Sequence, residues 1–252
     1  MAGHSHWAGI KHKKALVDNK RGKLWSKLSK AIIIAAKLGG GDPAANVRLR
    51  TAILDAKAGS MPKDTIERAI KKGTGELDGG NIEEVLYEGY GAGGVAVLCE
   101  IMTDNRNRTA PEIRKIFDVH NGKLGSTNCV AWMFERKGLF VVPVANTTEE
   151  QLMEVALEAG ADDVKEAGDS FEVTCDPENY ASVGDALEKA EIAINAKMVT
   201  RIPMTTVDLQ LEDARKVIKL LEALDDHDDV QNVSSNFSVS DEVMAAMEAA
   251  DS

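Results

Sequence analysis

Residues 20–38 read KRGKLWSKLSKAIIIAAKL, and this stretch decides how the N-terminal part of the chain folds. On a helical wheel of about 100° per residue, its lysines fall within an arc of roughly 100° and its apolar side chains fall on an adjoining arc. The lysines are Lys20, Lys23, Lys27, Lys30 and Lys37, and the apolar residues are Leu24, Leu28, Ala31, Ile32 and Ala35. We therefore expect a helix that packs on one side and points a lysine stripe into solvent.

Two more helices are expected after this stretch. Three glycines end the first helix, and Asp42 followed by a proline is a typical N-cap, which predicts a second helix over 43–58. A third helix is predicted over 62–73, where a glycine closes it. Residues 1–80 are therefore predicted to form a small helical domain, whose first residues, 1–19, form a polar and basic arm.

The charges of the chain are separated along its length. The formal net charge is -11 over 252 residues. However, residues 1–80 hold 16 Lys and Arg against 7 Asp and Glu, residues 81–145 hold 7 against 8, and residues 146–252 hold 7 against 26. Residues 1–40 contain one acid, Asp18, whereas an ordinary solvated helix face mixes both signs. A basic domain on an acidic remainder favours a polyanionic partner for the basic part.

Nucleic acid is the expected partner of the helical domain, because a lysine stripe suits phosphate contact and carries little information about bases. Reversal of Lys23, Lys27 and Lys30 to glutamate should then abolish binding and leave the fold intact. The residues expected at the interface are His4, His6, Trp7, Lys11, His12, Lys13, Lys14, Lys20, Arg21, Lys23, Lys27, Lys30, Lys37, Arg48, Arg50, Arg68, Lys71 and Lys72.

A second anion-binding loop is a candidate at Asn105, Arg106 and Arg108, between a predicted strand and a predicted helix. Such a loop can bring arginines and a helix N-terminus to an anion. Capping and local turn hydrogen bonds explain the same residues equally well, so both interpretations stay open.

The period of the apolar residues changes after residue 82. Strands are predicted over 85–90, 95–102 and 129–134, and Thr109-x-x-Glu112 is a capping box that opens a helix ending near residue 122. Residues 138–202 show the order βαββαβ of a ferredoxin-like unit. A strand over 206–211, a helix and a strand over 230–239 follow.

The fold class expected from this order is α+β with three domains, a small helical domain and two ferredoxin-like α/β domains, one inserted into the other. We predict a discontinuous middle domain of residues 81–137 and 203–241, an inserted domain of residues 138–202, and a C-terminal tail of residues 242–252. Three sequential domains are the alternative.

Several function classes find no support in the sequence. No apolar run approaches the roughly 20 residues of a spanning helix, and no secretory signal is visible. Cys99, Cys129 and Cys175 lie far apart, as expected of reduced thiols in a cytoplasmic protein. The three histidines of the arm match no zinc spacing, and the glycine-rich segment 89–94 precedes a strand and not a helix. We therefore expect a protein without catalytic activity, cofactor, metal or membrane contact.

The chain resembles the YebC/PmpR family in motifs spread over nearly its whole length. The matching stretches are 1–5 (MAGHS), Trp7, 20–23 (KRGK), 36–43 (AKLGGGDP), 61–70 (MPKDTIERAI), 87–91 (YEGYG), 103–109 (TDNRNRT) and 228–233 (DDVQNV). Departures from the family pattern are His6, Leu24-Trp25, Ala92, Asn128-Cys129 and Ser234-Ser235. None of these removes the lysine stripe, and a change at the last two pairs can alter contacts of the acidic part with a partner.

The resemblance implies three domains, one helical and two α/β, and no catalytic activity. Family members are described as probable transcriptional regulators that bind DNA, mitochondrial relatives as translational activators for cytochrome oxidase, and some bacterial relatives as ribosome-associated factors that ease synthesis of proline-rich stretches. Two functions therefore stay open, a DNA-binding regulator and a translation factor that binds ribosomal RNA. The sequence contains no clear recognition helix, and phosphate and shape recognition suits structured RNA at least as well as DNA.

Overall fold

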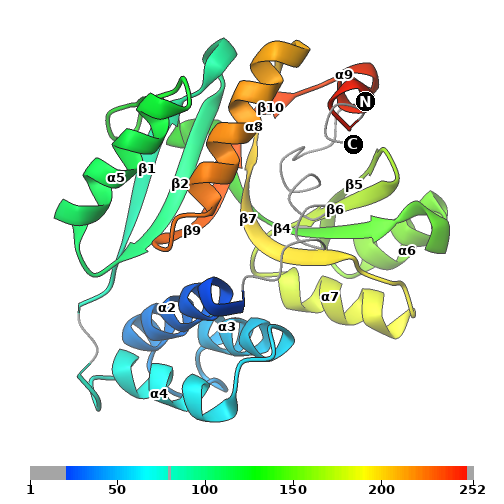
Figure 1. The fold of residues 1–252 in the computed structure, drawn as a ribbon. Coiled ribbons are helices and arrows are strands. Elements are labelled where there is room, and N and C mark those ends of the chain that lie inside the picture. Colours follow the sequence, from blue (N-terminus) through cyan, green and yellow to red (C-terminus); the bar gives the residue numbers. More distant parts are fainter. Residues whose placement is uncertain (1–20, 79–80, 249–252) are drawn as a thin grey trace.

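The structure, a computed structural model, describes residues 21–78 and 81–248, and it confirms the α+β class. Three helices are grouped below two separate four-stranded sheets (Figure 1). None of the helices among these residues is long and apolar enough to cross a membrane. The three helices are α2 (Arg21–Gly39), α3 (Val47–Ala58) and α4 (Lys63–Gly73).

The helical domain is held together by α2, which packs on both α3 and α4. Its core is lined by Ile32, Leu49, Ala56 and Ile66, all buried. The second helix begins four residues later than expected, and its N-cap is Asn46, not Asp42. The buried Asn46 amide accepts from the Leu49 amide (3.0 Å) and donates to the carbonyls of residues 35 and 40, so it joins the end of α2 to the start of α3.

Gly73 of α4 lies close against the backbone of α2. A Cβ atom at Gly73 would lie 2.5 Å from the Ile33 carbonyl oxygen and 2.6 Å from the Ala36 Cβ atom. Both neighbours belong to the buried side of α2, so neither has a flexible end that can move away. The glycine is therefore required by the crossing of the helices.

Replacing Gly73 with alanine is expected to lower the free energy of unfolding by about 2 kcal/mol, because the added methyl group overpacks this crossing. Thermal unfolding of the full chain measures the loss. Gly22→Ala is the matched control, because a Cβ atom there has no neighbour within 4 Å and alanine favours the helix. Equal midpoints for the two variants would contradict the tight crossing.

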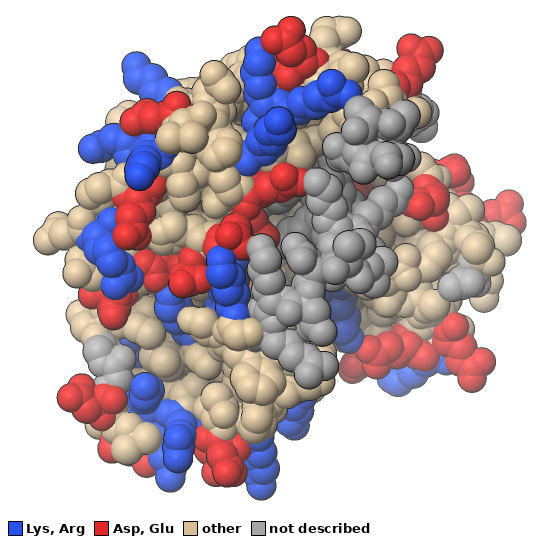
Figure 2. Space-filling model, viewed as in Figure 1, with Lys and Arg blue, Asp and Glu red and all other residues tan. Residues whose placement is uncertain are grey.

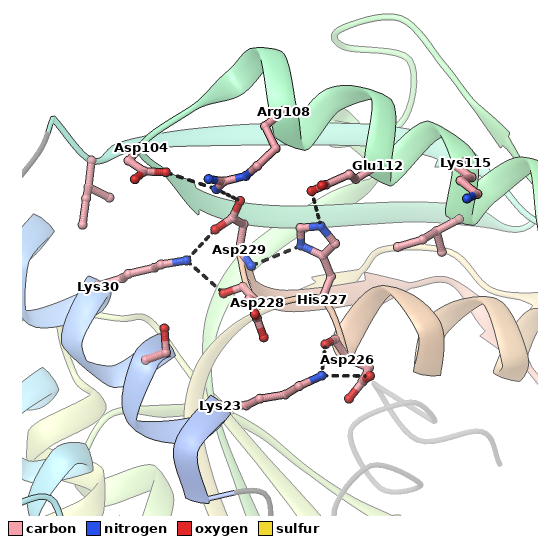
Figure 3. Close-up of a pocket in the computed structure, with 13 residues that line it drawn as sticks. Lys23, Lys30, Asp104, Arg108, Glu112, Lys115, Asp226, His227, Asp228 and Asp229 are labelled. Atoms are coloured by element: carbon pink, nitrogen blue, oxygen red, sulfur yellow. Dashed lines mark hydrogen bonds and ion pairs between the residues drawn. The ribbon is translucent and has the colours of Figure 1, made fainter.

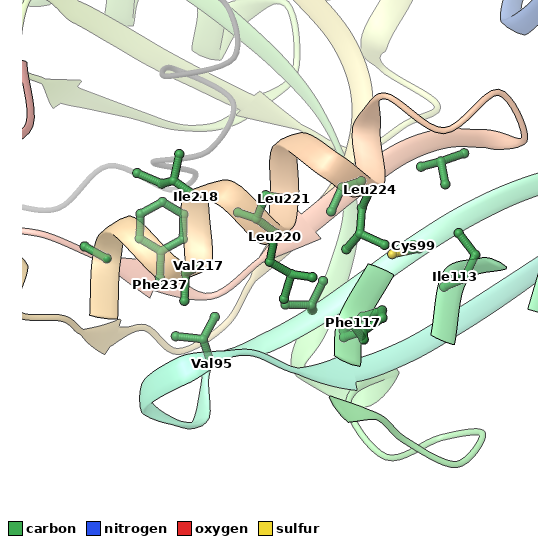
Figure 4. Close-up of a cluster of buried hydrophobic side chains, with 14 of the residues drawn as sticks. Val95, Cys99, Ile113, Phe117, Val217, Ile218, Leu220, Leu221, Leu224 and Phe237 are labelled. Carbon is green, nitrogen blue, oxygen red and sulfur yellow. The ribbon is translucent and has the colours of Figure 1, made fainter. Parts of the chain in front are cut away.

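The first sheet has the strand order β3-β1-β2-β9 and is antiparallel throughout. Helices α5 and α8 cover one of its faces, where Phe117, Ile113, Leu220 and Leu224 pack on the strands (Figure 4). The elements are β1 (Glu83–Tyr90), β2 (Ala96–Thr103), β3 (Lys123–Leu124), β9 (Val230–Ser235), α5 (Arg106–Val119) and α8 (Leu211–Asp225). The C-terminal part of the chain therefore completes the sheet that β1 and β2 begin.

The second sheet has the strand order β5-β6-β4-β7, which is the ferredoxin-like order, and α6 and α7 cover one face (Figure 1). The elements are β4 (Phe134–Pro143), α6 (Glu149–Glu158), β5 (Ala161–Ala167), β6 (Ser170–Cys175), α7 (Tyr180–Lys189) and β7 (Ala196–Pro203). The first sheet differs, because two adjacent strands precede its first helix. The ferredoxin-like topology thus applies to the second sheet alone.

The strands β4 and β7 are the first and last strands of the second sheet in the chain, so the chain enters this sheet through β4 and leaves it through β7. They pair with each other from Phe134↔Pro203 to Val141↔Ala196. The proposed domain boundaries after residues 137 and 202 fall inside these two strands. The placement of the second sheet between β3 and α8 in the chain agrees with an insertion, and the exact limits of the inserted domain stay a prediction.

Three local expectations are wrong. Thr109 does not cap α5. It lies inside the helix, with its hydroxyl oxygen 3.0 Å from the Asn105 carbonyl oxygen, while the Asn105 side chain is the N-cap. Residues 131–133 form a 3-10 turn, so the predicted strand over 129–134 starts only at its last residue, as β4. The first residues of the predicted tail belong to helix α9 (Asp241–Glu248), which packs on the apolar core of the first sheet.

The last predicted strands are also shorter than expected. Only β8 (Val207–Asp208) forms within 206–211, and it pairs in parallel with β10 (Phe237–Ser238). The expected strand over 230–239 is divided into β9 and β10, because Asn236 between them turns its side chain to accept from the Ala96 amide (2.7 Å).

Candidate nucleic-acid interface

Three lysines of α2 bind the chain that follows α8 and do not point into open solvent. Lys23 Nζ lies 2.9 Å from the Asp226 carbonyl oxygen and 3.0 Å from its Oδ2 atom. Lys27 Nζ lies 2.6 Å from the Asp225 carbonyl oxygen and 3.7 Å from its Oδ1 atom. We call Lys23, Lys27 and Lys30 the lysine face, and residues 225–229 (DDHDD) the acidic segment.

The innermost contact of the lysine face is made by Lys30. Its Nζ atom lies 2.5 Å from Asp229 Oδ1 and 3.0 Å from the Asp228 carbonyl oxygen. The Lys30 and Asp229 side chains are 17% and 4% exposed, whereas those of Lys23 and Asp226 are 42% and 50% exposed. The expectation of an outward lysine stripe is therefore wrong for this face, and its contacts become more buried from Lys23 to Lys30.

The end of α8 explains why lysines are held here. The last carbonyls of a helix have no intrahelical partner and carry the negative end of the helix dipole. The last turn of α8 contains no basic residue, and it is followed by further carboxylates. Lys23 and Lys27 supply the missing cations from another helix, and they cap α8 across the boundary between the helical domain and the first sheet.

Asp229 connects its own segment with α2, β2 and α5, and Figure 3 shows its contacts with Lys30 and Arg108. Besides Lys30 of α2, its carboxylate accepts from Thr103 Oγ1 at the end of β2 (3.1 Å). It also accepts from Arg108 Nη2 (2.8 Å) and Thr109 Oγ1 (2.7 Å) of α5. The motifs TDNRNRT and DDVQNV, which lie far apart in the sequence, meet at this carboxylate.

The charge of Asp229 is stabilised in the folded chain. Burial alone raises the pKa of this carboxyl, but the hydrogen bonds from Lys30, Thr109 and Arg108 lower it more strongly. The pKa of Asp229 therefore lies below the ordinary value for an aspartate. Asp229 is in consequence a buried anion held by two cations, and its partners depend on its negative charge.

An open cleft of about 710 Å³ lies beside these contacts. Lys23, Lys30 and Arg108 line it together with Lys115 and acidic side chains (Figure 3). His227 projects between them, and its ring bonds Glu112 (3.1 Å) and accepts from the Asp229 amide (3.1 Å). The cleft carries both signs of charge and is accessible from solvent along the lysine face.

Other predicted contact residues also form hydrogen bonds or ion pairs within the protein. Lys37 donates to Asn81 Oδ1 and to the Ile82 carbonyl (3.0 Å), and Arg48 forms an ion pair with Glu84. Arg50 donates to the carbonyls of residues 43 and 44. The arm residues and Lys20 lie outside the described residues, as does the side chain of Arg21.

Each residue of the second anion-binding candidate has a partner within the chain. Asn105 caps α5, Arg106 pairs with Glu83 (2.9 Å), and Arg108 pairs with Asp229 and Asp104. These contacts match the capping interpretation of the loop.

The remaining predicted residues lie together on α4. Arg68, Lys71 and Lys72 are exposed, and none of their side chains bonds another residue in the described part of the chain. Their spacing of three and four places them on one face of the helix, away from the buried Ile66 and Ala69. We call these three cations the α4 basic face. In Figure 2, blue side chains at the lower end of the molecule, where this domain lies, project into solvent, interspersed with red ones.

Several ionisable side chains away from the cleft have structural roles. Glu88 is buried, and its carboxylate accepts from the amides of Asn128, Val130 and Ala131 at 2.7 to 2.8 Å, which fixes that loop. Cys99 and Cys175 are buried free thiols, and burial raises the pKa of Cys175 to about 11. Among the described residues no cluster of three acids, histidines or cysteines is placed to hold a metal.

Sequence reasoning missed the acidic segment, Asn46 and Glu88. For the acidic segment a signal was available, because four aspartates in five residues directly follow a strong amphipathic helix. A chain that also contains a lysine-rich helix offers an internal partner for such a run. For Asn46 and Glu88 the partners are backbone groups brought together only by the fold, so no sequence pattern marks them.

Comparison with known proteins gives matches along the whole chain. The model of the TACO1/YebC protein N-terminal domain matches residues 5–76, and that of the TACO1/YebC second and third domain matches residues 82–237. A probable transcriptional regulatory protein of Natranaerobius thermophilus is 57% identical over 247 residues, which are 97% of this chain and 99% of that protein. A protein of the same description from Rhodopirellula baltica is 60% identical over 237 residues, 94% and 96% of the two chains.

A solved structure is similar over the same extent. The crystal structure of the conserved hypothetical protein Aq1575 from Aquifex aeolicus has a TM-score of 0.84 and 51% sequence identity, and the match covers 95% of this chain and 99% of that one. The resemblance inferred from the motifs is thus confirmed by sequence, by domain order and by fold. The chain belongs to the TACO1/YebC family.

Proposed function

We propose that the protein is a non-enzymatic, nucleic-acid-binding regulator of gene expression that contacts phosphates through its helical domain. The observation that carries the proposal is the α4 basic face, three exposed cations on one side of a helix without partners among the described residues. The naming of the two relatives above as probable transcriptional regulatory proteins supports a regulatory role.

The composition of α4 favours phosphate contact over base recognition. Helices that recognise bases usually present arginine, asparagine or glutamine near their N-terminus. The exposed residues in the first half of α4 are Lys63, Asp64 and Glu67, and Lys63 lies 3.7 Å from Glu67 in an ion pair. The cations of the α4 basic face lie in the second half, where lysines also stabilise the negative end of the helix dipole. Such a surface binds the nucleic-acid backbone without strong sequence preference.

Removing the α4 basic face by Arg68→Ala, Lys71→Ala and Lys72→Ala is expected to weaken binding of a labelled DNA duplex about tenfold or more. The slope of log affinity against log salt should become shallower by about one for each phosphate that the variant no longer neutralises. Fluorescence anisotropy of the full chain measures both quantities. The three side chains are exposed, so the thermal midpoint should change little.

The matched control removes three exposed cations outside the helical domain, with the changes Lys189→Ala, Arg215→Ala and Lys219→Ala. The net charge of the two triple variants is the same. An equal drop in affinity in both would show that overall charge alone is responsible and would contradict the assignment to α4. A parallel titration with structured RNA separates the two family functions, since stronger binding of RNA than of DNA favours the ribosome-associated alternative.

A further inference from the structure

We propose that the acidic segment occupies the lysine face as an internal competitor of nucleic acid, so that phosphate binding at Lys23 and Lys27 releases the acidic segment from them. The inference rests on the proposed function and adds a regulatory contact to it. In this arrangement the free protein covers part of its own basic surface. Nucleic acid reaches the α4 basic face first and gains the lysine face only by displacing the segment.

The contacts of the lysine face resemble those that phosphates offer. Each of the three ammonium groups meets two oxygen atoms of the acidic segment, one carbonyl and one carboxylate. A phosphodiester likewise presents two exposed oxygens to a lysine. A run of backbone phosphates along α2 therefore satisfies the same donors that the acidic segment now satisfies.

The outer contacts are suited to exchange, and the inner one is suited to anchoring. Lys23 and Asp226 are both about half exposed, and exposed ion pairs contribute little and are screened by salt. Lys30 is paired with the buried Asp229, which three further groups also hold. Lys27 is only 18% exposed, but its ion pair with the 25% exposed Asp225 is long, 3.7 Å, and so is weaker than the Lys30 pair. We therefore expect Lys23, and after it Lys27, to change partners while Lys30 stays with Asp229.

The surroundings give a polyanion access to these lysines. Lys23 and Lys30 line the open cleft of about 710 Å³, so two of the three lysines of the lysine face are reached from solvent without unfolding. Apolar contact across this boundary is limited in the described chain, where Ile82 and Met102 are the residues outside the helical domain that join its apolar cluster. The boundary is thus held largely by charges, which phosphate and salt can compete for.

A variant of the acidic segment tests the competition directly. Asp225→Asn with Asp226→Asn removes the two outer carboxylates, and we expect the full chain to bind a DNA duplex about fivefold more tightly or better. The control Glu154→Gln with Glu158→Gln makes the same change in net charge at exposed positions of α6. A gain no larger than that of the control would overturn the competition.

Hydrogen exchange of the wild-type chain gives a second test that needs no variant. Added duplex DNA should speed the exchange of amides in residues 225–228, because the segment loses its lysine partners, while it slows exchange in α4. Faster exchange in 225–228 supports the competition. Unchanged or slower exchange there, with DNA bound, overturns the competition and leaves the proposed function standing, whereas failure of the wild-type chain to bind DNA or RNA overturns both.

Discussion

The Asp229→Asn variant is expected to lose about 3 kcal/mol of stability at neutral pH, the largest effect of any single substitution considered for this chain. The carboxylate is 4% exposed and accepts hydrogen bonds from Lys30, Arg108 and two threonines. Asparagine keeps the shape but removes the charge, so two cations lose their buried counter-ion and the new amide NH₂ group faces other donors. Urea-induced unfolding of the full chain measures the loss.

The adjacent substitution Asp228→Asn is the matched control. The Asp228 side chain is exposed, and it is the backbone carbonyl of this residue, not its carboxylate, that accepts from Lys30. The control should therefore change the free energy of unfolding by less than about 0.5 kcal/mol. Similar losses in both variants would show that Asp229 is not the centre of this network.

The effect of Asp229 should also depend on pH, in a direction fixed by its lowered pKa. A carboxyl with a lower pKa in the folded chain than in the unfolded chain, where it is about 3.9, contributes fully above about pH 5. The contribution declines as the pH falls through 3.9 towards the folded pKa. The stability difference between the wild type and Asp229→Asn is therefore expected to shrink between about pH 5 and pH 3, and an unchanged difference would contradict the charge of Asp229 as its cause.

Reversal of the lysine face, by Lys23→Glu, Lys27→Glu and Lys30→Glu together, is expected to detach the helical domain from the acidic segment. Each glutamate would face an aspartate at a distance now set by an ion pair, and the one at residue 30 would meet the buried Asp229. The loss of stability should be about 4 kcal/mol or more, since breaking one buried pair alone costs about 3 to 5 kcal/mol. The sequence-based expectation that this variant keeps its fold is therefore replaced by the expectation of a loosened one.

Small-angle X-ray scattering and thermal unfolding together measure this effect. The radius of gyration should rise and the first unfolding transition should move to lower temperature. The control Arg68→Glu, Lys71→Glu and Lys72→Glu makes the same change in net charge on α4, where these side chains bond no described residue, and should stay compact. A compact and equally stable lysine-face variant would contradict the structural role of these contacts.

The helices and the second sheet were predictable because local signals agree with the fold. The apolar spacing in 20–38 gives α2 within one residue at each end, and the βαββαβ order gives the strand order of the second sheet. Errors arose where a local motif competes with tertiary contact. Thr109 matches a capping box, but its hydroxyl is bound by Asp229, which lies 120 residues away.

The candidate site was predicted less well than the fold, for a physical reason. A helical wheel shows that the lysines of α2 share one face, but it cannot show what that face meets. Three of them meet the acidic segment, which is about 200 residues distant in the chain. The α4 cations were predicted only as further basic charge of the helical domain, and they lie free of described partners, because α4 is at the end of the molecule away from the sheets (Figure 1).

The salt dependence of nucleic-acid binding by the wild-type chain tests the central claim most directly. Anisotropy titrations of a DNA duplex between about 50 and 200 mM salt should give a log–log slope of about -0.9 for each phosphate bound, and a value of about -3 for the α4 basic face alone. A slope steeper than this value would indicate that Lys23 and Lys27 also bind phosphates. No binding, or binding that salt leaves unchanged, would contradict the claim that this protein holds nucleic acid through the phosphates.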